Sequence, residues 1–145
     1  MKESIEKLTK FLEEFPQKLS EIPESETEIK PTPAKWSKKE ILGHLIDSAS
    51  NNHQRFVRTQ QASHLLFPPY SQDHWIRNQH YQTESWKNLV SFWESYNRHL
   101  LHIISNIPED KLENHCVIGT DPPKTLAFLI EDYVNHLEHH LEQIL

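Results

Sequence analysis

The stretch that decides the fold is Lys35–Phe56, "KWSKKEILGHLIDSASNNHQRF". Ser37 and, three residues later, Glu40 have the spacing of a capping box, in which each side chain bonds the other residue's backbone N–H at a helix start. Apolar residues stand at the two flanking positions of a hydrophobic staple. These signals predict a helix over residues 38–62, from which the rest of the chain can be interpreted.

An amphipathic helix is predicted before this stretch. Its apolar residues alternate spacings of three and four, the period of a helix that packs into a bundle: Ile5, Leu8, Leu12, Phe15, Leu19 and Ile22. Pro16 lacks a backbone N–H and its ring collides with the preceding turn, so we expect a kink or a break there. A polar connection with several prolines then leads to Lys35.

Two further helices are predicted after it. One begins near Thr83 and ends before Pro108, and the other begins near Lys124 and runs to Ile144. Between them, "HCVIG" at residues 115–119 is interpreted as a short extended piece. Four helices of this kind predict an all-α protein, a four-helix bundle.

The connection Gln60–Gln82 is longer than most connections in compact domains, which rarely exceed about 12–15 residues unless they are functional or disordered. It carries four large aromatic residues, too many for a disordered segment: Phe67, Tyr70, Trp75 and Tyr81. We therefore expect an ordered crossover packed over one end of the bundle. Residues 1–145 are interpreted as a single domain.

Composition excludes several classes of function. The chain has 15 lysines and arginines and 21 acidic residues, which gives a net charge of −6. This negative charge argues against nucleic-acid and anionic-membrane partners. No apolar run approaches the roughly 20 residues of a membrane span, and the charged N-terminus is no signal peptide. Cys116 is the only cysteine, which fits a reducing compartment. We expect a cytoplasmic protein.

The last predicted helix carries His136, His139 and His140. With Tyr133 at zero and about 100° per residue, His140 lies about 20° and His136 about 60° from the apolar stripe, whereas His139 lies about 120° away. Two inward imidazoles, spaced i and i+4, can share a divalent ion. Hydrogen bonds to backbone or water remain the alternative, because this spacing alone is weak evidence.

The helix over residues 38–62 supplies a third imidazole and a polar stripe. At spacings of four, three, four and four, this stripe comprises His44, Ser48, Asn51, Arg55 and Thr59. Its composition suits the lining of a wet pocket, although an ordinary helix flank would also account for it. Three imidazoles leave coordination positions for water or substrate, as in catalytic rather than structural sites.

Three nearby residues have competing interpretations. Arg55 can hold an anionic group of a substrate or of a thiol, or form a structural salt bridge. Asp47 can orient an imidazole, or make a solvated or local helix contact. Cys116 lies alone beside His115 and is a poor candidate for a nucleophile.

At this point the sequence resembles the DinB/YfiT-like superfamily of metal-dependent enzymes. Residues 35–56 match its W-S-x-x-E-x-x-x-H-L-x-D-S pattern, "PPYSQDHW" follows at 68–75, and "LIEDYVNHLEHHLEQI" at 129–144 matches its closing H-x-x-x-H-L-x-Q-I. The three blocks occur in the family's order and span about residues 36–144.

The resemblance implies a four-helix bundle that holds a divalent ion, nickel or zinc, through His44, His136 and His140. It also implies a homodimer, and a thiol S-transferase activity that some relatives have. The first hypothesis is therefore a metal-dependent enzyme that transfers a low-molecular-weight thiol to a small electrophile, with Ser48, Asn51 and Arg55 binding substrate. The alternatives are a hydrolase that uses metal-bound water and a non-catalytic metal-binding or dimerising protein.

Overall fold

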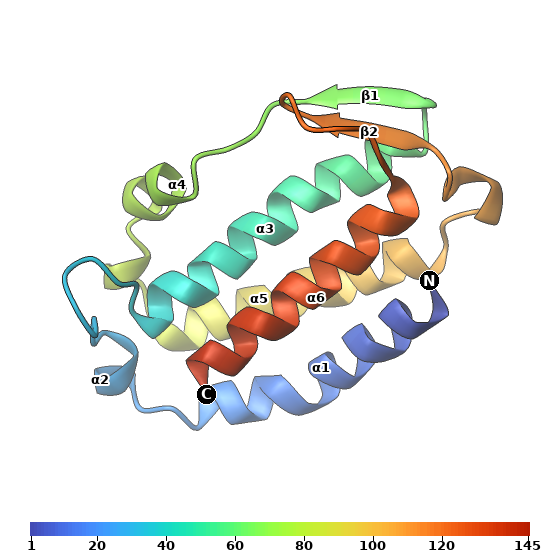
Figure 1. The fold of residues 1–145 in the computed structure, drawn as a ribbon. Coiled ribbons are helices and arrows are strands. Elements are labelled where there is room, and N and C mark those ends of the chain that lie inside the picture. The colour runs from blue at the N-terminus through green and yellow to red at the C-terminus, as the bar shows by residue number, and fades with distance from the viewer.

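Four long helices lie side by side in the computed structural model, which describes all 145 residues: α1 (Lys2–Ser20), α3 (Lys38–Thr59), α5 (Trp86–Ser105) and α6 (Leu126–Ile144). α1 and α6 run in one direction, and α3 and α5 run in the other (Figure 1). Because α3 and α5 are parallel, the connection between them returns along the length of the bundle. The predicted four-helix bundle with a long crossover is confirmed.

Shorter helices and strands form the connections between the four long helices. They are α2 (Glu24–Thr27), β1 (His64–Phe67), α4 (Gln72–Gln79), β2 (His115–Ile118), β3 (Lys124–Thr125) and two 3-10 turns at Tyr81–Thr83 and Glu109–Lys111. β1 pairs in parallel with β2, and β2 pairs antiparallel with β3. The sheet lies outside α3 and α6 (Figure 1). The extended piece predicted at residues 115–119 is confirmed as β2, whereas β1 and α4 were not predicted.

Hydroxyl side chains cap the start of each long helix after α1. The Glu40 N–H donates to Ser37 Oγ (3.2 Å) and the Ser37 N–H donates to Glu40 Oε1 (3.1 Å), which is the predicted capping box. Ser85 and Thr125 accept in the same way at the starts of α5 and α6. α5 therefore begins three residues, and α6 two residues, later than the sequence predicted, and α3 ends at Thr59 rather than near residue 62.

At Pro16, where we expected a kink or a break, the helix is not broken, because α1 continues through this residue to Ser20. A proline leaves the carbonyl four residues earlier without its helical partner. Here that carbonyl belongs to Leu12, and it accepts a hydrogen bond from Arg98 Nη2 on α5 at 3.1 Å. A cation from a neighbouring helix thus satisfies the orphaned oxygen.

Buried polar groups tie the helices together inside an apolar core to which all four contribute. Lys39 is only 2% exposed and forms ion pairs with Glu24 (2.6 Å) and Glu28 (3.0 Å), which fix α2 against α3. The Tyr133 hydroxyl of α6 donates to Asn97 Oδ1 of α5 at 2.5 Å. None of the helices combines the length and the apolar character that crossing a membrane would require.

Gly43 on α3 lies directly under the ring of Tyr81. A Cβ at this position would stand 2.2 Å from Tyr81 Cδ2, well inside contact distance. The same ring is buried, and its hydroxyl donates to Asp47 Oδ1 at 2.6 Å. The absence of a side chain at Gly43 therefore lets the crossover dock onto α3, one residue before His44.

We predict that Gly43→Ala lowers the free energy of unfolding by about 1–3 kcal/mol, the usual effect of overpacking. This loss exceeds the gain of up to about 1 kcal/mol expected from alanine's higher helix propensity. Chemical denaturation of the variant measures the difference. In a chain that also carries Tyr81→Ala, Gly43→Ala should no longer destabilise; an equal cost in both backgrounds would show that the ring is not the cause.

Candidate metal centre

His44 lies on the face of α3 that packs against α6, and it is only 1% exposed. Its ring lies 5.0 Å from the Trp36 ring, measured between centroids. Burial of an imidazole is costly unless its nitrogen atoms find partners. The chain thus places a polar ring where a bundle helix would ordinarily have an apolar residue.

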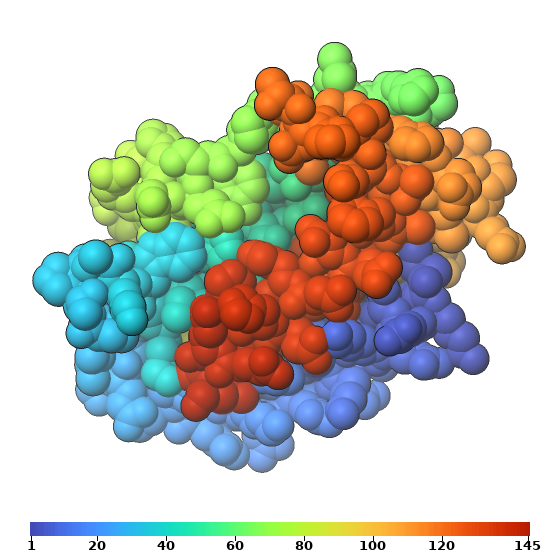
Figure 2. Space-filling model, in the orientation of Figure 1, coloured from blue at the N-terminus to red at the C-terminus, as the bar shows by residue number.

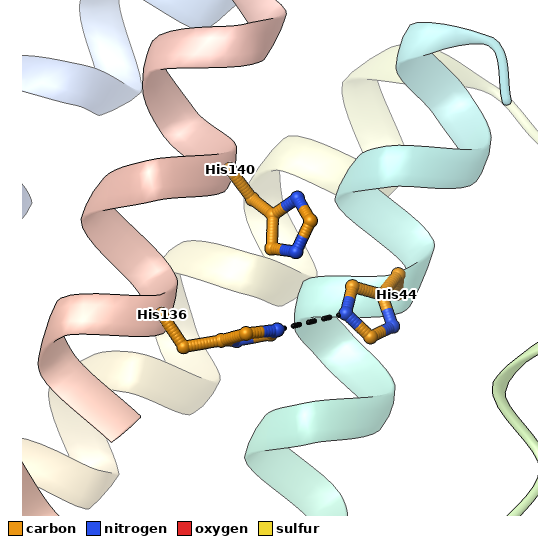
Figure 3. Close-up of side chains that lie close together, drawn as sticks. All are labelled: His44, His136 and His140. Carbon is orange, nitrogen blue, oxygen red and sulfur yellow. Dashed lines mark hydrogen bonds between the residues drawn. The ribbon is translucent and has the colours of Figure 1, made fainter. Parts of the chain in front are cut away.

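Its partners come from α6, as the helical wheel predicted. His136 and His140 lie one turn apart on the side of α6 that faces α3, and their ring centroids are 4.5 Å apart. Both rings point towards His44, at centroid distances of 4.9 and 4.8 Å (Figure 3). The three residues have potential ligand nitrogens that all lie within 4.8 Å of one another.

Two ring nitrogens in this cluster face each other directly. His44 Nε2 and His136 Nε2 are 3.0 Å apart (Figure 3). His140 directs its Nδ1–H at Gln143 Oε1 (2.8 Å), which leaves the lone pair on Nε2. A hydrogen bond to the second nitrogen is the usual way in which proteins orient an imidazole for metal ligation.

All three imidazoles are held neutral by their surroundings. Burial, reinforced by the neighbouring histidines, lowers the pKa of His44 to about 3 and that of His136 to about 4. Burial also lowers the pKa of His140, although Gln143 opposes this shift. Near pH 7 the cluster therefore offers lone pairs rather than positive charge, the state that metal ligation requires.

The donor set fits a divalent transition metal. Imidazole suits zinc and nickel, and no cysteine or carboxylate belongs to the group. Three ligands would leave positions free for other molecules. The Nδ1 atoms of His44 and His136 are buried without a hydrogen-bond partner in the protein, so the rings are held by packing and their polar atoms are left for other partners.

The remaining histidines lie outside the cluster. His139 is exposed, as the wheel predicted, and its Nε2 contacts Gln143 Nε2 at 3.1 Å. On the far side of α3, His53 bonds the Tyr96 hydroxyl at 3.0 Å. His64 of β1 stacks on His115 of β2.

A cavity of about 170 Å³ leads away from the cluster. His136 contributes to its wall from α6, Ser48 and Arg55 from α3, and Tyr70 and Gln72 from the crossover. In Figure 2 this region is a recess over α3, between the light-green crossover and the orange-red start of α6. Two of the three predicted substrate-binding residues, Ser48 and Arg55, therefore share one cavity with a predicted ligand.

Asn51, the third of these residues, does not line this cavity, and its amide donates to the Asp47 carbonyl (2.9 Å). Asn52 lines it instead, and donates to the Ser48 carbonyl (2.9 Å). Sequence reasoning missed Asn52, although it stands one turn after Ser48, which was the available signal. Asp47 contacts no imidazole; it accepts from Tyr81 and from Gln79 Nε2 (2.6 Å).

A second cavity, of about 500 Å³, adjoins the other side of the cluster. Trp36, which contacts His44, and Gln143, which bonds His140, are in its wall. The remaining wall is formed by Pro31, Ala34, Lys35, Ile41 and Asp73. None of the three imidazoles lines this second cavity, so only the cavity of about 170 Å³ has one of them, His136, in its wall.

Comparisons with known proteins agree with this architecture. The family model of the DinB superfamily matches residues 7–144. YfiT from Bacillus subtilis, described as a probable metal-dependent hydrolase with an unusual four-helix bundle topology, superposes with a TM-score of 0.84 at 21% identity. The match covers 99% of this chain and 85% of YfiT. No curated protein matches the sequence. Because the family model spans nearly every residue of the bundle, the chain belongs to the DinB superfamily.

Proposed function

We propose that this protein is a divalent-metal-dependent enzyme that acts on a small molecule, with the ion held by His44, His136 and His140. The observation that supports it most directly is the convergence of three neutral imidazoles from two helices, His44 buried and His136 and His140 half-buried, with two ring nitrogens 3.0 Å apart. Neutral imidazoles are common ligands of catalytic zinc and related ions. One of the three, His140, also has the hydrogen bond at its second nitrogen that is usual for a metal-ligating histidine.

A zinc or nickel ion at this position would act as a Lewis acid and lower the pKa of a bound nucleophile. The residues around it have separate tasks. Gln143 orients His140 through its Nδ1–H. Trp36 covers His44 on the side of the larger cavity. Ser48, Asn52 and Arg55 line the approach for substrate, so Asn52 takes the place that we had expected for Asn51.

Transfer of a low-molecular-weight thiol to an electrophile is the first candidate reaction. The family resemblance suggests it, and the cavity of about 170 Å³ that His136 lines would give a reactant access to the cluster. Lowering the thiol's pKa generates the thiolate, which is the reactive nucleophile.

Hydrolysis is the second candidate, with water as the nucleophile. It is supported by the description of YfiT as a probable metal-dependent hydrolase, a protein that shares this fold at 21% identity. A non-catalytic metal-binding protein is the remaining alternative. In that protein the cavity beside His136 would have no substrate to hold.

We predict that His44→Ala, His136→Ala and His140→Ala each weaken zinc or nickel binding by at least about a hundredfold, since even loss of a ligand's hydrogen-bond partner commonly costs 10–100-fold. Metal analysis of tag-free protein and calorimetric titration measure the effect. His139→Ala, on the same helix but exposed, is the matched control and should bind metal as the wild type does. Full stoichiometry after His140→Ala would exclude this ligand set.

Metal affinity should depend only weakly on acidity. Ligands must be unprotonated to bind, and the pKa values of about 3 and 4 keep His44 and His136 neutral well below pH 6.5. Between pH 7.5 and 5.5 we expect the affinity to fall by no more than about tenfold. Three exposed imidazoles with ordinary pKa values near 6.5 would lose about a thousandfold over the same range, and such a loss would contradict the buried geometry.

The two reactions separate in one assay. With a panel of small electrophiles and esters, the metal-loaded protein should turn over an electrophile only when a low-molecular-weight thiol is added. Turnover in buffer alone would instead establish hydrolysis. Loss of either activity in His44→Ala, together with its retention in His139→Ala, ties the reaction to the cluster. No turnover under any condition favours the non-catalytic alternative.

A further inference from the structure

Arg55 is the one charged side chain in the interior of α3 that lacks a partner. It is only 8% exposed, yet it forms no hydrogen bond and no salt bridge with any other group of the chain. The other buried cation, Lys39, has two glutamate partners. Its guanidinium nitrogens keep some accessible surface, on the cavity that the side chain lines. A charge that is so largely withdrawn from water without a partner is costly, so its position requires an explanation beyond folding.

The guanidinium lies in the wall of the 170 Å³ cavity that also contains His136. Asp132 is another wall residue and the nearest acidic side chain, but no ion pair joins it to Arg55 within 4.0 Å. The structural salt bridge, which was the alternative for Arg55, is therefore not formed. Burial lowers the pKa of Arg55, while Cys116, Tyr70 and Asp132 oppose that shift, and the side chain keeps its charge at neutral pH.

We infer that Arg55 binds a carboxylate of the substrate, and that the enzyme's small-molecule substrate is therefore a carboxylic acid whose reactive atom points towards His136. The placement of the reactive atom near His136 rests on the proposed function, and the carboxylate identifies the substrate class. A planar guanidinium presents paired N–H donors that match the two oxygens of a carboxylate.

The other wall residues favour a monoanionic carboxylate over a phosphate. Arg55 is the only cation that lines the cavity, and Asp132 adds a negative charge to the same wall. A phosphate dianion would meet one cation and one repelling carboxylate. The hydroxyl and amide groups of Ser48, Asn52 and Tyr70 provide neutral polar contacts beside Arg55.

The geometry also limits the length of the substrate. Arg55 lies 11 residues after His44 on α3, about 16 Å along the helix axis, and shares its cavity with His136. The cavity is smaller than the 300–1,000 Å³ typical of drug-sized ligands. A carboxylate held at Arg55 therefore belongs to a short chain that places its reactive atom several bonds away, on the side of His136.

Stability of the metal-free protein is the first test. Arg55→Met removes a buried charge that has no partner, so we expect the unfolding temperature to rise by at least about 2–4 °C. Arg58→Met, which replaces an exposed arginine on the same helix, is the matched control and should change it little. A drop in unfolding temperature for Arg55→Met would mean that Arg55 is structural, and would overturn the inference.

Ligand binding is the second test, with butyrate as the probe and butyramide as its neutral analogue. Titration followed by NMR should show saturable binding of butyrate, and none of butyramide, to the metal-free wild type. Arg55→Gln should weaken butyrate binding at least tenfold, Arg55→Lys should weaken it less, and Arg58→Gln should leave it unchanged. Equal affinity in Arg55→Gln and wild type, or no butyrate binding with or without metal, would refute the assignment.

Metal-free protein keeps this test separate from the proposed function, because a bound ion could itself attract the carboxylate. If zinc and nickel fail to bind while butyrate binds through Arg55, the metal proposal fails and the carboxylate site stands. If metal binds through the three histidines while butyrate binds nowhere, the metal proposal stands and the carboxylate site fails.

Discussion

The packing of α3 against α6 is the contact on which the rest of the structure depends, because it brings three imidazoles together, one buried and two half-buried. Each ring alone would be a liability in a bundle core. Together they are neutral at physiological pH and face one another. Their mutual approach depends on the rotation of α6, since a shift of one residue would turn His136 by about 100°. Whatever fixes α6 therefore fixes the candidate centre.

Several contacts far from the cluster hold α6 and α3 in position. The Tyr133 hydroxyl bonds Asn97, and its ring contacts Phe56 on α3 at a centroid distance of 5.7 Å, so α6 is held against two neighbours. Thr125 sets where α6 begins. On α3, the capping box and the ion pairs of Lys39 hold the end of the helix that carries His44. The candidate metal centre thus rests on ordinary helix-capping and core hydrogen bonds.

Local sequence signals were enough to predict the four helices, the ordered crossover, and the inward position of His44, His136 and His140. These features follow from helix periodicity and from capping chemistry, which act over a few residues. That the three histidines bind a metal stays a prediction. What the sequence did not reveal depends on partners distant in the chain: β1 exists because it pairs with β2, and α1 continues through Pro16 because Arg98 lies 82 residues further on. Asn52 was missed because it fits a helical stripe as well as Asn51 does, and only the position of the crossover shows which of the two side chains lines the cavity.

The crossover is secured at both ends of the part that faces the cavity. On the N-terminal side of Tyr70, the Phe67 carbonyl accepts a hydrogen bond from the Gly119 N–H at 2.8 Å. Pro69 packs against Gly119, whose positive φ suits a residue without a side chain. On the C-terminal side of Tyr70, α4 packs on α3. Tyr70 therefore projects from a short span between two firm attachments, and Gln72 from the first turn of α4. Substitutions at these two positions would change the wall of the cavity while leaving the three histidines untouched, so the shape of the cavity and the composition of the cluster can vary independently.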